Sequence, residues 1–201
     1  MSYYELWAIL ASWRREFSIA EFALTFASPD PRKVLHDMVG KGLLEHPKRG
    51  RYSVRSIGDY VKMKNDVNAG YDLLNEAGMP YALTGLDGVF AWTGGAYNAG
   101  RFFGFYPIHL KVRSRDVPFW RRFLTAAGKR VFTTERRPRE TIFGVFYILH
   151  AAMSVEAETV NGVKVEPLRE TLEFCRKNIY TFEPALNMLT ENHRVSPRAS
   201  A

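Results

Sequence analysis

Cysteine is nearly absent from this chain of 201 residues, with Cys175 as its single example. One cysteine excludes an intramolecular disulfide and a zinc site built from several thiolates, which favours a reducing compartment. No apolar run approaches the roughly 18 residues that a membrane span needs, and the opening MSYYELWAIL lacks the cationic region and cleavage site of a signal peptide. We therefore expect a cytoplasmic protein with no membrane partner, in which Cys175 packs as a small apolar residue.

Common catalytic and cofactor-binding motifs are also missing. GxGxxG, the Walker P-loop, HExxH and GxSxG do not occur, and the glycines between residues 92 and 104 predict a loop instead of a phosphate cradle. The histidines show no metal-ligand spacing, and His150, which follows an apolar run, is expected to be a hydrogen-bonded core residue. The sequence thus predicts no metal and no cofactor.

Acidic residues are the minority charge, because 21 Asp and Glu stand against 28 Lys and Arg for a net charge of +7. Residues 1–65 hold eleven cations and seven acids, a net +4, whereas the larger remainder holds seventeen and fourteen, a net +3. Positive charge is therefore densest at the front of the chain, which favours a polyanionic partner there. The length and the 46% apolar content suit a protein of two domains.

Residues 17–54 predict two short helices followed by a basic hairpin. Ser18 and Glu21 form the capping box of a helix that extends to Phe26. Ser28-Pro29-Asp30 ends that helix, and Asp30 before Pro31 is a cap with proline at the first helical position. The second helix is amphipathic, with apolar residues on one face and a mostly cationic opposite face: Val34, Leu35, Met38 and Val39 against Arg32, Lys33, His36 and Asp37.

The hairpin begins after Gly40 and Gly42, which end the second helix. Residues 43–45 predict a first strand, 47–50 a turn and 51–54 a second strand. Its tip carries three cations: Lys48, Arg49 and Arg51. An apolar stripe between Tyr4 and Trp13 predicts a further helix that completes a three-helix core.

This order of helices and hairpin is that of a winged helix-turn-helix. In that arrangement the second helix enters the major groove of DNA while cations of the wing contact phosphates. We therefore expect groove contacts from one set of residues and backbone contacts from another: Arg32, Lys33 and His36 for the groove, and Lys48, Arg49 and Arg51 for the phosphates. The alternatives are a winged helix that docks another protein and surface cations that are merely solvated.

The second half of the chain predicts a mixed α/β domain. Predicted helices at 57–66 and 69–77 join the halves, and we divide the chain into a winged helix-turn-helix domain at 1–67, an α/β domain at 68–192 and a polar tail at 193–201. Within the second domain, residues 79–92 predict a short strand, a turn and a helix. Further strands are expected at 109–112, 131–133 and 145–149 and in an Asn161-Gly162 hairpin of 155–160 with 163–165, and helices at 116–127, 167–178 and 182–191.

Four segments carry a resemblance to a known family: GLLEHPKRGRYSV, YALTGLDGVFAWTG, HLKVRSRDVPFWRRFL and VNGVKVEPLRETLEFC. Over residues 5–190 the chain resembles the AbiEi-like family of antitoxins and transcriptional regulators. The resemblance implies a winged helix-turn-helix followed by an α/β domain, promoter binding, repression of its own two-gene operon, and neutralisation of a nucleotidyltransferase-like toxin as partner. It implies a DNA-binding regulator and repressor in a toxin–antitoxin system, acting without catalysis.

An enzyme is the alternative for the second domain. A glycine-containing turn after a strand, as at residues 84–88, also opens the nucleotidyltransferase fold, to which this domain is related in outline. Such enzymes place two carboxylates on the next strand to bind metals, but here that strand carries His109 and Lys111. Asp87 and Asp116 remain, and because each lies at a predicted helix start we expect both to be caps.

A second basic group lies among aromatic residues farther along the chain. It is a possible second binding surface, and we single out Arg121, Arg122, Arg136 and Arg137. It could extend the DNA footprint, meet an acidic toxin, or be a solvated edge. No heptad pattern specifies a dimer, so the oligomeric state stays open, with a homodimer on DNA as one arrangement.

Overall fold

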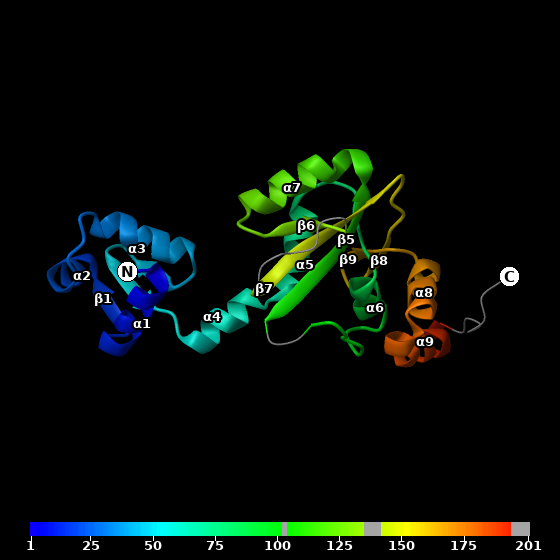
Figure 1. Cartoon of the computed structure of the whole chain (residues 1–201), viewed down its shortest axis with the longest axis horizontal. Coiled ribbons are helices and arrows are strands. Elements are labelled where there is room, and N and C mark those ends of the chain that lie inside the picture. Colours follow the sequence, from blue (N-terminus) through cyan, green and yellow to red (C-terminus); the bar gives the residue numbers. More distant parts are fainter. Residues whose placement is uncertain (102–103, 135–141, 194–201) are drawn as a thin grey trace. The chain divides into compact units, whose positions relative to one another are not determined.

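The computed structural model describes residues 1–101, 104–134 and 142–193. The chain divides into two compact units, residues 1–63 and 64–201, each with helices and a sheet (Figure 1). The division falls inside the helix α4 (Ile57–Lys64), slightly before the predicted end of the first domain at residue 67. In the ranges described, no helix has the length and apolar character to cross a bilayer.

The first unit alternates short helices with a small antiparallel sheet, in which the strand order is β1-β3-β2. Its elements are α1 (Tyr3–Trp13), β1 (Glu16–Ser18), α2 (Ile19–Thr25), α3 (Pro31–Gly40), β2 (Leu44–Lys48), β3 (Arg51–Val54) and α4. The predicted helices and the two hairpin strands are all present. β1 was not predicted from the sequence, because three residues are too few to show an alternating pattern.

Local capping explains where α2 and α3 begin. The Ser18 hydroxyl accepts from the Glu21 amide at 3.2 Å while the Glu21 carboxylate accepts from the Ser18 amide at 2.7 Å, which confirms the capping box. The Asp30 carboxylate accepts from the Lys33 amide at 3.0 Å, with Pro31 at the start of α3. Both helices therefore start where their side chains satisfy the free amides.

The hairpin turn is tighter than predicted. β2 continues to Lys48, which is paired with Arg51, so only Arg49 and Gly50 form the turn instead of residues 47–50. Gly50 has φ +74°, a conformation that glycine adopts without a steric penalty. The register is irregular between Glu45 and Lys48, where Pro47 has no amide hydrogen to donate.

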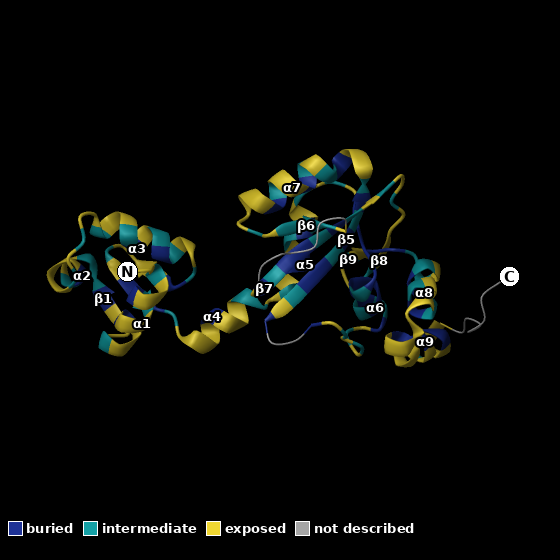
Figure 2. Ribbon diagram, in the orientation of Figure 1, coloured by how far each residue is buried: buried dark blue, intermediate teal, exposed yellow. Residues whose placement is uncertain are grey.

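The core of the first unit is aromatic and aliphatic. Leu10, Phe17, Leu35 and Met38 are fully buried, and the Phe17 ring stacks on Tyr52 with centroids 6.0 Å apart. These residues come from helices and strands alike, so the core joins α1 and α3 to the sheet. The exposed faces of the three helices remain at the surface (Figure 2).

The second unit is built on a six-stranded mixed sheet of order β6-β7-β5-β4-β9-β8, as expected for a mixed α/β domain. Its elements are α5 (Val67–Glu76), β4 (Ala82–Leu83), α6 (Leu86–Trp92), β5 (Phe105–Arg113), the 3-10 turn η1 (Ser114–Asp116), α7 (Val117–Ala126), β6 (Val131–Thr133), β7 (Gly144–Ala152), β8 (Glu158–Val160), β9 (Val163–Val165), α8 (Leu168–Lys177) and α9 (Ile179–His193).

The long parallel pair β5 and β7 separates the two faces of this sheet. Leu110 is paired with Leu149 on a face that packs against Trp120 and other apolar residues of α5 and α7. The paired residues Lys111 and His150 lie on the opposite face. A separate cluster joins α6, α8 and α9 and contains the buried Cys175, as the sequence predicted.

Candidate nucleic-acid interface

α3 presents the predicted groove residues on its exposed side. Arg32, Lys33 and His36 are all exposed, and the Lys33 and His36 side chains keep 72% and 88% of their accessible surface. Leu35 and Met38 on the other side are fully buried. The helix is therefore held by its apolar face and leaves the cations to solvent.

One carboxylate lies among the cations of α3. The Tyr3 hydroxyl donates to Asp37 at 2.7 Å, and this hydrogen bond lowers the pKa of Asp37. Lys33 Nζ lies 3.6 Å from the same carboxylate and His36 Nδ1 lies 3.8 Å from it. Asp37 thus offsets part of the charge of its neighbours, whereas Arg32 forms no ion pair within the described part of the chain.

The hairpin carries the three predicted phosphate-binding residues, all of them exposed: Lys48, Arg49 and Arg51. Lys48 and Arg51 are paired across the turn. The Arg51 guanidinium also lies 3.6 Å from the Glu21 carboxylate at the start of α2, and the Gly50 carbonyl accepts from the Ile19 amide at 3.4 Å. The hairpin tip is therefore anchored beside the N-terminus of α2.

Arg14 joins this group, although the sequence reasoning did not select it. Its guanidinium donates to the other oxygen of Glu21 at 2.7 Å and lies 5.4 Å from the centre of the Trp13 ring. Glu21 therefore holds Arg14 and Arg51 together while it caps α2. The capping box identified Glu21 in the sequence, but its side-chain partners depend on the fold.

The second basic surface is described only in part. Arg121 and Arg122 are exposed on α7, where Trp120 and Leu124 are buried on the core side. Arg136 and Arg137 lie outside the described residues. The structure thus places two of the four arginines on one helix of the second unit.

The two acids considered for catalysis are occupied by donors, and neither is a helix cap as predicted. Asp87 is fully buried and accepts from the Tyr71 hydroxyl and the His109 amide at 2.6 Å each, and from the Arg101 guanidinium. Burial raises the pKa of Asp87, and Arg101 opposes that rise. Asp116 precedes α7 but caps no amide, because its carboxylate accepts from Arg113 Nε at 2.7 Å.

The strand that would need paired carboxylates in an enzyme has cationic and imidazole side chains. His109 Nδ1 lies 2.9 Å from His150 Nε2, and burial lowers the pKa of each histidine to about 4. Lys111 Nζ lies 3.2 Å from the buried Glu166 and also pairs with Glu170. Among the residues described, no cluster of three or more His, Cys, Asp or Glu could hold a metal ion.

Comparison of the chain with protein-family models and with curated proteins finds no match. The resemblance to AbiEi-like regulators therefore rests on the four sequence segments alone. What the protein does has to be argued from the placement of its own charged residues.

Proposed function

We propose that residues 1–63 form a winged helix-turn-helix that binds duplex DNA and that the protein is a sequence-specific transcriptional regulator. The observation that carries the proposal is the exposure of two sets of cations on one small folded unit. One set lies on α3 and the other on the hairpin between β2 and β3. The order of α2, α3 and the hairpin supports this assignment.

The two sets have different tasks in this proposal. Side chains on the exposed face of α3 read base edges in the major groove, since a helix fits that groove and each base pair presents a distinct pattern there. Lys48, Arg49 and Arg51 contact phosphates, which fixes the register and supplies most of the salt-dependent affinity. The resemblance to AbiEi-like antitoxins extends the proposal to repression of an operon and to neutralisation of a partner toxin.

A selection experiment followed by titration tests the proposal. Duplexes enriched by the full-length protein from a random pool are titrated by fluorescence anisotropy with three proteins: the natural chain, Arg32→Ala, and the double variant Lys48→Gln/Arg49→Gln. We expect Arg32→Ala to change the preference among enriched sequences. The double variant should weaken binding to all duplexes and reduce the salt slope by about 1.8, or two times about 0.9 per lost phosphate contact.

Two results would contradict the proposal. One is a pool that shows no enrichment and no salt-dependent binding by the natural chain. The other is a double variant with unchanged affinity and slope, since Lys48 and Arg49 are exposed hairpin residues whose loss leaves the core intact. Circular dichroism of each variant establishes that it is folded.

A further inference from the structure

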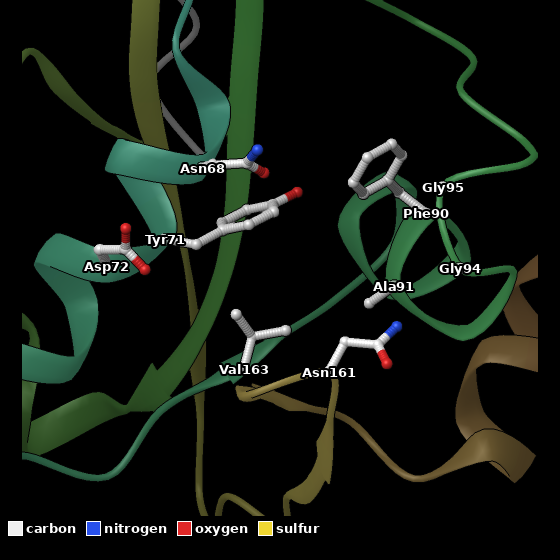
Figure 3. Close-up of a pocket in the computed structure, with 9 residues that line it drawn as sticks. All are labelled: Asn68, Tyr71, Asp72, Phe90, Ala91, Gly94, Gly95, Asn161 and Val163. Atoms are coloured by element: carbon white, nitrogen blue, oxygen red, sulfur yellow. The ribbon is translucent and has the colours of Figure 1, made fainter.

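The second unit contains a pocket that the proposed DNA-binding surface does not use. It has a volume of about 330 Å³ and is lined by α5, by the end of α6 with the two glycines that follow it, and by the tip of the hairpin between β8 and β9 (Figure 3). Ligand pockets in proteins start near this size. The space therefore suits a compact molecule.

The inner wall of the pocket is apolar and aromatic, with the rings of Tyr71 and Phe90 beside Ala91 and Val163 (Figure 3). The Tyr71 hydroxyl donates to Asp87 at 2.6 Å and accepts from Arg101 at 2.7 Å, so its ring is held in place. The same guanidinium lies 4.9 Å from the centre of the Phe90 ring. A buried ion pair thus fixes both aromatic walls before any ligand arrives.

The outer part of the pocket is polar but carries no cation. The amide of Asn68 lies beside Tyr71 and that of Asn161 lies near Ala91 (Figure 3). Within the described part of the chain, neither amide forms a hydrogen bond with another residue. Asn161 is held at φ +49° by the turn it shares with Gly162, and Asp72 adds a carboxylate to the lining.

Two adjacent glycines leave a further wall as bare backbone. Gly94 and Gly95 have φ of +62° and +85°. A side chain at Gly95 would begin 3.4 Å from the Phe90 ring, so larger residues there would crowd the aromatic wall. The backbone at this point keeps the pocket open beside Phe90.

We propose that this pocket binds an uncharged planar heterocycle of the nucleobase class, with adenine as the base that its side chains suit best. Aromatic rings offer a stacking surface that accepts a base, and asparagine amides present a donor and an acceptor that match the edge of adenine. Among the described residues, no Lys, Arg or His lines the pocket, so a phosphate group attached to the base gains no ion pair in it.

Adenosine is the probe that tests the proposal, with binding to the full-length protein measured by isothermal titration calorimetry in the absence of DNA. Saturable binding is expected, and AMP should bind no more tightly than adenosine. Asn68→Ala and Asn161→Gly should each weaken adenosine binding by about fivefold or more, because each removes a hydrogen-bonding amide. Glycine accepts the left-handed conformation of residue 161, so the turn should be preserved.

Asn187→Ala is the matched control, since Asn187 is exposed on α9 and does not line the pocket. This variant should bind adenosine like the natural chain. The proposal is overturned if adenosine at millimolar concentration shows no saturable binding, if the double variant Asn68→Ala/Asn161→Gly keeps the natural affinity, or if AMP binds more than about tenfold tighter than adenosine.

Discussion

The ion pairs of Glu21 lead to a variant that should bind DNA more tightly than the natural chain. Glu21 lies within ion-pair distance of both Arg14 and Arg51. Hydrogen bonding to Ser18 lowers the pKa of Glu21, so the carboxylate is ionised at neutral pH and neutralises part of the charge beside the hairpin. Replacing it with glutamine removes that charge, while glutamine can still serve in a capping box.

The salt dependence of binding sets the expected magnitude. Each cation that meets a phosphate contributes about 0.9 to the slope of log affinity against log salt concentration. If Glu21→Gln releases both arginines for phosphate contacts, the slope steepens by up to about 1.8, which is two times 0.9. At low salt we expect the affinity to rise about threefold to tenfold, and the gain should fade as salt increases, because screening weakens the added contacts.

Anisotropy titrations of an enriched duplex between about 50 and 200 mM salt measure both quantities. Glu173→Gln is the matched control, because Glu173 also forms an exposed ion pair, 2.7 Å from Lys177, and its loss raises the net charge by the same unit in the other part of the chain. Equal affinities and slopes for the two variants would refute the reasoning that Glu21 competes with phosphate for these arginines.

The remaining predictions concern the buried groups of the second unit. Because burial lowers the pKa of His109 and His150 from 6.5 to about 4, the neutral pair contributes stability above pH 6.5 that is lost as the pH falls towards 4. Urea unfolding should show this loss, at up to about 1.4 kcal/mol per pH unit for each histidine, and His109→Gln/His150→Gln should flatten it between pH 6.5 and 5. Asp87→Asn should lower the unfolding free energy by about 3–5 kcal/mol, since it leaves the Arg101 charge buried without its partner; an unchanged urea midpoint would contradict this.

Local rules in the sequence were sufficient where neighbouring residues decide the structure. The Ser18–Glu21 capping box and the Asp30–Pro31 start of α3 are both present. Asn161-Gly162 likewise forms the turn between β8 and β9. In each case the residues that satisfy the backbone lie within a few positions of one another, so no knowledge of the fold is needed.

Contacts between distant residues could not be predicted in the same way. β1 exists because it pairs with β3, more than 30 positions later, and not because of its own three residues. His109 and His150 meet only because β5 and β7 run parallel in a particular register. The cap expected at Asp87 was wrong for the same reason, since the carboxylate is taken by Tyr71 and Arg101 from other parts of the chain.

Net charge alone does not distinguish the two units, and the partners of the cations do. In the second unit, Arg101, Lys111 and Arg113 are paired with carboxylates of the same unit, so much of its positive charge stabilises the fold. In the first unit Arg32, Lys48 and Arg49 are exposed, and within the described ranges no carboxylate pairs with them. A polyanion can bind the second group without breaking an existing ion pair, whereas it would have to displace an internal carboxylate from the first. This difference in cost, more than the count of basic residues, favours the first unit as the DNA-binding part of the chain.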